Sequence, residues 1–479
     1  MAFPGGPGLK SRRALPPGPR GVPLVGNALQ FRRDPLGFLT RAARDHGDIV
    51  RLTAGRQELV FINHPALLES VLATNARRFT RSKSKPPSRV DYFLAGGEDV
   101  YRVINFPGDE DFWVRERHRF NPSLKGSALA RYGPTMVRMA ERHVSTWSNG
   151  EVREVHREML RITLDIVLNA LYGVDFPGDR EHILDTCETI VRDITHRATH
   201  PFQAPPIVPT RENRVLRQAV ADGRKLVERI IREHPEVHAE GGDLIDMLGR
   251  AGEHEAGLLE NPEWQYQIIA LLIAGHETTA VALTWTWYLL AQHPSIAERL
   301  YTEVDTVLDG RRPRKDDLAA LPWCDAVFKE ALRLYPPVPI IPRMAYEEFS
   351  LGDYPVAPGS VILICPWVTH RDARFFAAAE RFRPERWLEG PEPRRYTYLP
   401  FSGGPRTCIG ASFATAEAIL AIARIAQQYR LELTTGEEPR PAPWVGLRPH
   451  NGMPMQVAAR TRPVQATHRD SERRATGPA

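Results

Sequence analysis

Cysteine is scarce in this sequence of 479 residues, and its four cysteines lie far apart. Because they form no Cys-x-x-Cys pair, neither a disulfide framework nor a structural zinc site is indicated. Long uninterrupted apolar runs are missing too. The longest, around residues 268–274, is far short of the ~20 residues that span a bilayer. We therefore expect a reduced, cytoplasmic setting and no transmembrane anchor.

Acidic residues are absent from the first 33 positions, which are rich in proline, glycine and arginine. This stretch also lacks the apolar core of a signal peptide. We expect a mobile basic arm over residues 1–14, one domain over residues 15–460 and a disordered polar tail over residues 461–479. The net charge of +5 is modest, and no zinc-finger spacing or stacking motif accompanies it, so nucleic acid is not an expected partner.

Hydrophobic residues make up 42% of the chain and charged residues 25%, which is the balance of a globular protein. Spaced apolar positions predict a mainly helical chain, and two short stretches bounded by turn residues predict strands. The expected helices cover residues 65–75, 133–147, 155–172, 180–196, 211–234 and 411–428, and the expected strands cover residues 52–62 and 356–364.

The longest predicted helix begins with an Asn-Pro-Glu sequence at residues 261–263, which is typical of a helix start. It runs unbroken to His293 and stops at Pro294. About thirty residues at ~1.5 Å each give a rod of roughly 45 Å, enough to cross a whole domain. Apolar residues nearly all round predict that the helix is buried. Glu277 and Thr278, in its middle, break that pattern and need an explanation.

A glycine-rich segment, Phe-Ser-Gly-Gly-Pro-Arg-Thr-Cys-Ile-Gly at residues 401–410, precedes the last predicted helix. A cysteine just before a helix lies near backbone N–H donors and the positive end of the helix dipole, which favour the thiolate. A thiolate is the strong axial donor that a heme iron needs for O–O cleavage. Phe401 can shield the sulfur, and Arg406 can reach a propionate. For an isolated cysteine, a small buried side chain in a glycine turn would be the better interpretation.

The spacing of this segment resembles the heme-binding signature of the cytochrome P-450 family, Phe-x-x-Gly-x-Arg-x-Cys-x-Gly, at every defined position. The resemblance implies a mainly α fold with small β-sheets, the P-450 prism with its long central helix. It also implies heme b as the cofactor. Cys408 would be the axial thiolate ligand of the iron, with Phe401, Arg406 and Gly410 in the loop that surrounds it.

Residues 274–279, Ala-Gly-His-Glu-Thr-Thr in the long helix, look like the oxygen-activating segment of that family. A small residue and a glycine open a groove, Thr278 can hydrogen-bond the oxygen molecule, and Glu277 is placed to relay protons toward it. The alternative is a threonine bonded back to its own helix and an acid that faces solvent. With Cys408 present, we expect Glu277 and Thr278 to be catalytic.

A second group of residues is expected to be structural. Glu330 and Arg333 share one helix face. The family places a later arginine, here Arg386, against this pair. Such a Glu–Arg–Arg network can bond bidentately and pin the segment beneath the heme.

Further cofactor contacts are expected at the heme propionates. Trp113 and Arg117 look like the family's Trp-x-x-x-Arg helix, and their N–H groups suit propionate oxygens. The alternative is a surface cluster of aromatic and basic side chains. Arg343 is a further candidate, and His118 and His370 are weaker ones.

The resemblance, which covers roughly residues 15–460, implies a monomeric monooxygenase. It would insert one oxygen atom of O2 into a lipophilic small molecule such as a terpenoid, lipid, steroid or polyketide. By their position relative to the motifs, several segments are expected to line the substrate pocket. These segments are residues 88–106, 190–210, 271–275, 338–341 and 445–453.

No flavin or ferredoxin domain follows residue 460, so we expect electrons from a separate acidic ferredoxin or flavodoxin. Such a partner would be steered to a basic face on the Cys408 side of the heme. The arginines expected there are Arg115, Arg119, Arg371, Arg374 and Arg424. A peroxygenase and a non-catalytic heme sensor are the alternatives, and the Glu277–Thr278 pair argues against both.

Overall fold

The computed structural model describes residues 15–55, 57–79, 114, 117–118, 120–199, 208–234, 243–246, 262–434, 438–443 and 446–460. Helices dominate these residues and the strands form small sheets, which confirms the expected fold class. The arm expected over residues 1–14 and the tail expected over residues 461–479 lie outside the described residues.

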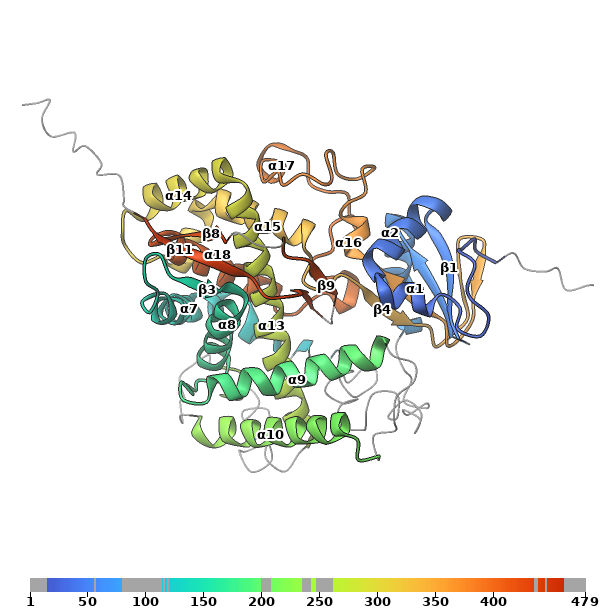
Figure 1. Ribbon diagram of the computed structural model, residues 1–479, viewed down its shortest axis with the longest axis horizontal. Coiled ribbons are helices and arrows are strands. Elements are labelled where there is room, and N and C mark those ends of the chain that lie inside the picture. The colour runs from blue at the N-terminus through green and yellow to red at the C-terminus, as the bar shows by residue number, and fades with distance from the viewer. Residues whose placement is uncertain are drawn as a thin grey trace, which may run out of the picture.

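Figure 1 shows a long central helix, α13, with other helices packed around it and a strand-rich lobe at one side. The α-helices are α1 (Ala28–Arg33), α2 (Pro35–His46), α3 (Pro65–Glu69), α7 (Ser127–Val144), α8 (Val155–Leu171), α9 (Arg180–Thr199), α10 (Arg211–Glu233), α13 (Pro262–Gln292), α14 (Pro294–Leu308), α15 (Pro322–Leu334), α16 (Pro366–Thr369), α17 (Arg386–Glu389) and α18 (Ala411–Ala426). The strands are β1 (Ile49–Ala54), β2 (Gln57–Ile62), β3 (Val152–Glu154), β4 (Ile341–Met344), β5 (Phe349–Leu351), β6 (Tyr354–Val356), β7 (Val361–Ile364), β8 (Tyr429–Leu433), β9 (Pro441–Pro443), β10 (Leu447–Pro449) and β11 (Pro454–Ala459).

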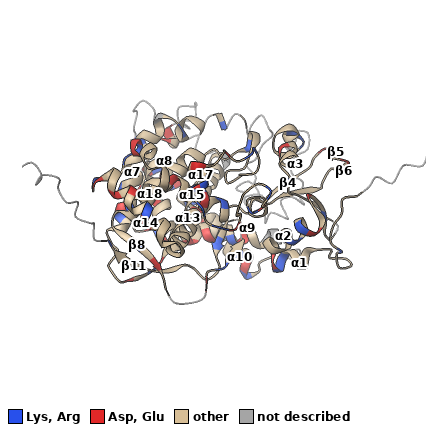
Figure 2. Ribbon diagram, turned by 90° about the horizontal axis from the view of Figure 1, so that it is seen from above, with Lys and Arg blue, Asp and Glu red and all other residues tan. Residues whose placement is uncertain are grey.

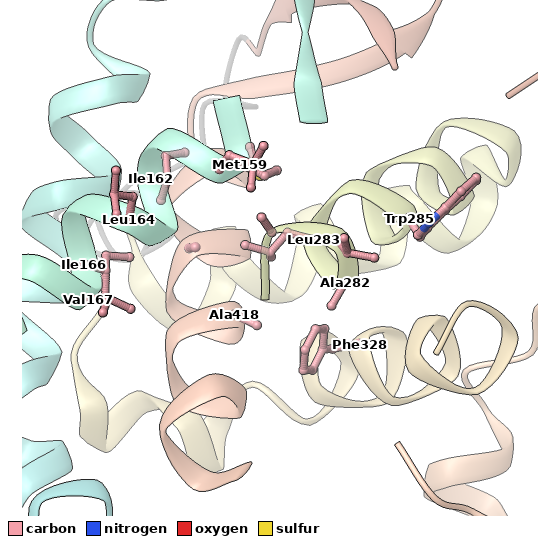
Figure 3. Close-up of a cluster of buried hydrophobic side chains, with 14 of the residues drawn as sticks. Met159, Ile162, Leu164, Ile166, Val167, Ala282, Leu283, Trp285, Phe328 and Ala418 are labelled. Atoms are coloured by element: carbon pink, nitrogen blue, oxygen red, sulfur yellow. The ribbon is translucent and has the colours of Figure 1, made fainter. Parts of the chain in front are cut away.

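Helix α13 is apolar nearly all round because other helices cover most of its surface. It packs along α8 and also contacts α10, α15 and α18. Figure 3 shows the side chains that meet in this core, among them Met159 of α8, Leu283 of α13 and Phe328 of α15, all at most 1% exposed. The hydroxyl of Tyr172, just after α8, donates to the carbonyl of Ile268 at 2.9 Å. Residues 274–279, expected from the sequence to activate oxygen, therefore lie within a helix that other helices bury on most sides.

The strand-rich lobe contains a four-stranded sheet in the order β1-β2-β7-β4. Strand β1 pairs antiparallel with β2, which runs parallel to β7. The single strand predicted over residues 52–62 is wrong, because the chain turns at Gly55 (φ +60) and forms a hairpin. The strand predicted over residues 356–364 is likewise divided, since Gly359 (φ +89) separates β6 from β7. Glycine at positive φ is the turn signal that the apolar pattern overrode.

The long helices lie close to their predicted positions, and the differences are at helix ends. Helix α7 begins at Ser127, six residues before the predicted start, so that Pro134 lies inside it. Its first turns are anchored by Ala128 and Tyr132, both buried. The helix predicted over residues 65–75 ends as α-helix at Glu69, and a π-helical turn continues it.

Helix α13 is long and apolar enough to resemble a membrane-spanning helix. By length and composition alone Trp264–Gln292 could cross a membrane, which the count of uninterrupted apolar residues had missed. However, 72% of its most apolar window is buried inside the fold. In the part of the chain that the structure describes, this apolar helix is thus accounted for as the core of the domain.

Candidate active site

The loop that carries Cys408 is held by its own backbone. The N–H of Cys408 donates to the carbonyl of Phe401 at 2.8 Å, which closes the loop directly before α18. Gly404 has φ +69, and a Cβ atom there would lie 1.8 Å from the carbonyl oxygen of Leu72, so only glycine fits. Gly410 occupies the N-cap position of α18. The structure therefore brings the predicted residues of this loop together at the start of a helix.

Cys408 is the exposed cysteine of the four, whereas Cys187, Cys324 and Cys365 are buried. Burial raises the pKa of Cys408, while the N–H of Gly410 and the charge of Arg117 lower it less strongly. The helix start alone thus does not keep the sulfur ionised, which differs from the sequence prediction. A metal ion that binds the sulfur displaces the proton outright.

Arginines surround this loop. Arg117 Nη1 donates to the carbonyl of Thr407 at 2.5 Å, next to Cys408. Burial and the nearby charge of Arg406 lower the pKa of Arg343 to about 10. The positive charges of Arg343 and Arg406 repel each other, so an anion that binds near both guanidinium groups would stabilise them. The donor set, one accessible sulfur with arginines beside it, therefore fits a heme: the sulfur suits the iron and the arginines suit the propionates.

One face of α13 is accessible in the middle of the core. Leu271, Ala274, Gly275 and Thr278, at helical spacing, are accessible to differing degrees, while most residues of the helix are buried. The hydroxyl of Thr278 donates to the carbonyl of Ala274 at 2.8 Å, which is the bond to its own helix that the alternative interpretation predicts. A hydroxyl keeps its lone pairs when it donates, so Thr278 can still accept a hydrogen bond from a group on the accessible face.

Glu277 is locked in a buried ion pair that the sequence did not indicate. Arg448 of β10 donates to both carboxylate oxygens through Nε and Nη2, at 2.5 Å each, and its Nη1 lies 3.4 Å from Glu188 of α9. Burial alone would raise the pKa of Glu277, but the hydrogen bonds and charge of Arg448 lower it below its ordinary value. The alternative of an acid that faces solvent is therefore excluded for Glu277. As a proton carrier Glu277 would depend on its bond to Arg448.

Replacing Arg448 by methionine should destabilise the fold by about 3–5 kcal/mol at neutral pH, because Glu277 is left as a buried charge without a cation. The pKa of Glu277 is lowered in the native protein, so the pair stabilises above the ordinary carboxyl pKa and loses this contribution as pH falls through the lowered value. In the variant, burial raises the pKa of Glu277 and protonation relieves the unpaired charge.

Denaturant unfolding across pH measures this difference directly. The gap in free energy of unfolding between the native protein and Arg448→Met should be widest at neutral pH and narrow toward acid pH. Arg448→Lys, which keeps a cation, is the matched control and should lose less. A gap that stays constant with pH would mean that Arg448 stabilises by packing alone.

A second buried carboxyl lies beside Thr279, at the end of the segment 274–279. Glu417 of α18 is fully buried, and among the described residues no hydrogen bond of ordinary geometry reaches its oxygens, the Thr279 hydroxyl being the near neighbour. Burial raises the pKa of Glu417 well above its usual range, and the hydroxyl of Thr279 lowers it less strongly. Glu417 is therefore neutral where Glu277 is charged. An acid within an apolar helix was a readable signal, as it was for Glu277, but the sequence interpretation did not use it.

The three residues expected to be structural form one buried network. Arg333 binds both oxygens of Glu330 at 2.9 Å, and Glu330 also accepts from Arg386 at 3.0 Å and from Trp387 at 2.9 Å. Both Glu330 and Arg333 are fully buried. The remaining N–H groups of Arg333 donate to the carbonyls of His370, Ala379 and Arg381. The network joins α15 to the segment that precedes the Cys408 loop.

Other predicted contacts fall differently. Trp113 lies outside the described residues, so its place is not seen. His370 is wrong as a propionate contact, because it is fully buried and used within the fold. Its Nε2 accepts from the N–H of Leu399 at 2.7 Å, and its Nδ1 lies 3.1 Å from the carbonyl of Arg333. Burial lowers the pKa of His370 to about 3, which keeps the ring neutral.

The site can be compared with known proteins. A model of the cytochrome P-450 family matches residues 16–454. Cyclooctatin synthase of Streptomyces melanosporofaciens is 35% identical over 439 residues, which span 90% of this chain and 92% of that protein. Pentalenene oxygenase of Streptomyces avermitilis is 30% identical over 446 residues, 92% of this chain and 97% of that protein. Retinoic acid-bound cyanobacterial CYP120A1 matches in structure with a TM-score of 0.77 and 22% identity, over 93% of this chain and 99% of that one.

Proposed function

Because the chain belongs to the cytochrome P-450 family, we propose that it oxidises a terpenoid by inserting one oxygen atom of O2. The family consists of heme-dependent monooxygenases. When bound, the heme supplies reductive activation of O2 and transfer of one oxygen atom to the substrate. The observation that carries the proposal is the accessible sulfur of Cys408, set at the start of α18 with Arg117, Arg343 and Arg406 around it.

The roles of the remaining residues follow from their positions. We assign the propionates to Arg117, Arg343 and Arg406, which provide the positive charge. The accessible face of α13 borders the reaction space, and Thr278 accepts a hydrogen bond there. Glu277 gains and loses protons at its carboxylate as its bond to Arg448 opens and closes. Burial on α13 keeps bulk water away from this exchange.

The substrate class rests on the chemistry of the site and on the relatives. The accessible face of α13 presents Leu271, Ala274 and Gly275, so the molecule that lies against it is largely apolar. Two relatives that match over nearly their whole lengths are named cyclooctatin synthase and pentalenene oxygenase, and both names refer to terpenoids. Of the segments expected to line the pocket, residues 271–275 and 338–341 are described fully, whereas residues 88–106 lie outside the described residues.

We also propose that the protein works in the cytoplasm. The proposed reaction is tested by a turnover assay. The heme-loaded protein is incubated with pentalenene as a probe, a ferredoxin, its reductase and O2, and products are weighed by mass spectrometry. A product heavier by one oxygen atom that appears only with the reductant supports the proposal. Product formed with hydrogen peroxide alone would favour a peroxygenase. A spectral response to ligands without turnover of any terpene would favour a heme sensor.

The basic docking face expected from the sequence is wrong for the three arginines that are described. Arg374 pairs with Asp48 and Asp372, and Arg424 pairs with Glu141 at 3.0 Å. Arg371 is largely buried, with its guanidinium against the ring of Trp367 and 3.3 Å from Glu380. Figure 2 shows the same arrangement more broadly, with basic and acidic segments interspersed over the helices. Arg115 and Arg119 lie outside the described residues.

We propose a different docking surface for the acidic redox partner. A cavity of about 520 Å³ lies against the Cys408 loop, lined by residues 402–404 and Thr407 and by the segment 390–396. Arg394 and Arg395 stand exposed in its lining. The pair between Arg395 and Glu69 is long, 3.7 Å, and solvent-exposed, so it neutralises little of this charge.

Replacing Arg394 and Arg395 together by glutamate should slow reduction by an acidic ferredoxin about tenfold at low salt, because rim charges act mainly on the association rate. Stopped-flow reduction across a salt series measures the effect, which should fade as ionic strength rises. Arg32→Glu with Arg33→Glu on α1 makes the same charge change in the strand-rich lobe and is the control. Equal slowing by both double variants would show a net-charge effect and remove this docking surface.

A further inference from the structure

The accessible face of α13 continues beyond the residues assigned so far. Leu271, Ala274 and Thr278 recur at intervals of three and four, so they lie on one side of the helix. One further turn toward the N-terminus, the same spacing reaches Gln267. By helical geometry Gln267 falls within the arc of these three residues. The arc thus ends in an amide after a series of apolar and small residues.

Gln267 is only 2% exposed, and within the part of the chain that the structure describes neither its Oε1 nor its Nε2 has a hydrogen-bond partner. The neighbours of Gln267 in the sequence, Ile268 and Ile269, are buried on other sides of α13, where Ile269 packs against Gly223 of α10. A buried amide that forms no hydrogen bond is costly, and native proteins keep few of them. Leucine or methionine would suit the position better if it served packing alone.

We propose that Gln267 is a substrate-recognition residue, whose amide hydrogen-bonds a hydroxyl group on an otherwise apolar substrate. A hydroxyl matches an amide fully, because Oε1 accepts its proton and Nε2 donates to its oxygen. The inference rests on the proposed monooxygenase function and narrows its substrate class.

The position of Gln267 also sets the shape of the substrate. Gln267 lies eleven residues before Thr278 on the same helix, which places it ~16 Å away along the axis. The hydroxyl is therefore at the end of the molecule remote from the carbon that is oxidised. The substrate is an elongated terpenoid alcohol, already oxygenated once. The reaction that supplies it must install a free hydroxyl group, by hydroxylation, by hydrolysis of a terpenoid ester or diphosphate, or by a cyclisation that ends in the capture of water.

A series of imidazole ligands of increasing length tests the proposal without knowledge of the substrate. Each probe is a 1-alkylimidazole, whose ring nitrogen binds the heme iron, paired with the same chain ending in a hydroxyl. Chains of increasing length are titrated into the heme-loaded protein, and dissociation constants are read from the shift in the heme spectrum. In the native protein, one range of chain lengths should show at least about tenfold tighter binding of the alcohol than of the alkane.

Methionine is close in length to the native side chain. Gln267→Met should abolish this preference, because binding of the alcohol probe weakens while binding of the alkane probe stays unchanged or becomes tighter. Gln265→Met is the matched control, since two residues turn the helix by ~200° and put Gln265 on the far side. Because ligand-free Gln267→Met loses an unpaired buried amide, its melting temperature should not fall.

Two results would overturn the inference: no preference for the alcohol at any length, or a preference that survives in Gln267→Met. Should Gln267→Met misfold, Gln267→Leu serves in its place, because leucine forms no hydrogen bond and should abolish the alcohol preference in the same way. Failure of the proposed function looks different, since then no imidazole of either series shifts the spectrum.

Discussion

Cys408→Ser should abolish the thiolate-type absorption of the reduced carbon monoxide complex. Serine keeps the size of the side chain, and the hydrogen bond from the Cys408 N–H to Phe401 does not involve the sulfur. The change therefore removes the donor atom without removing the loop. A hydroxyl is a far weaker electron donor to iron than a thiolate, so monooxygenase activity should be lost with the spectrum.

The other cysteines provide the control. Cys187, Cys324 and Cys365 are buried, and burial raises the pKa of Cys187 and of Cys365 to about 12. None of them offers an accessible sulfur. Cys365→Ala should therefore keep the spectrum that Cys408→Ser loses. Survival of the thiolate-type spectrum in Cys408→Ser would require another sulfur ligand and would refute the site.

Thr278→Ala should uncouple reductant consumption from product formation. Thr278 lies on the accessible face of α13 with a hydroxyl that can accept one hydrogen bond, while Cys408 and the arginines that we assign to the propionates lie on other elements. Substrate and cofactor binding should therefore change little. Loss of ordered proton delivery, a general-acid contribution of about 10²–10⁴, should divert the electrons of the reductant into hydrogen peroxide. Product formed per reductant consumed measures the effect.

Thr286→Ala is the matched control for this experiment. Thr286 lies on the same helix and donates to the carbonyl of Ala282 at 2.7 Å, as Thr278 does to Ala274, but it is fully buried. Both variants lose a hydrogen bond from a threonine hydroxyl to the carbonyl four residues earlier in α13. Only Thr278→Ala also loses a group on the accessible face. If the two variants couple equally well, Thr278 serves the helix and has no part in the reaction.

Local sequence patterns predicted what is local in the structure. The Cys408 loop is closed by bonds between near neighbours such as Phe401 and Cys408, and α13 is determined by its own apolar composition. The hairpin at Gly55 was missed because two apolar stretches were joined across a glycine. Even that error lay within the reach of the printed sequence, since Gly55 is a turn residue.

What the sequence could not predict are pairs between distant residues. Glu277 and Arg448 are 171 positions apart, and nothing around Arg448 marks it as the partner of a buried acid. The basic face failed for the same reason, because Asp48 and Glu141, which neutralise Arg374 and Arg424, come from remote parts of the chain. A count of arginines near a motif gives charge, but only the fold shows which charges remain exposed.

Arg333 should make the unfolding of residues 370–381, the segment that precedes the Cys408 loop, cooperative. Its guanidinium closes bonds to the carbonyls of His370, Ala379 and Arg381 and to Glu330 at once. If one of these turns opened alone, a fully buried cation would lose acceptors that water could not replace. Partial fluctuations are therefore suppressed, and residues 370–381 open together with α15 or not at all. The Cys408 loop is thus preceded by a segment that either keeps its conformation or unfolds as a whole.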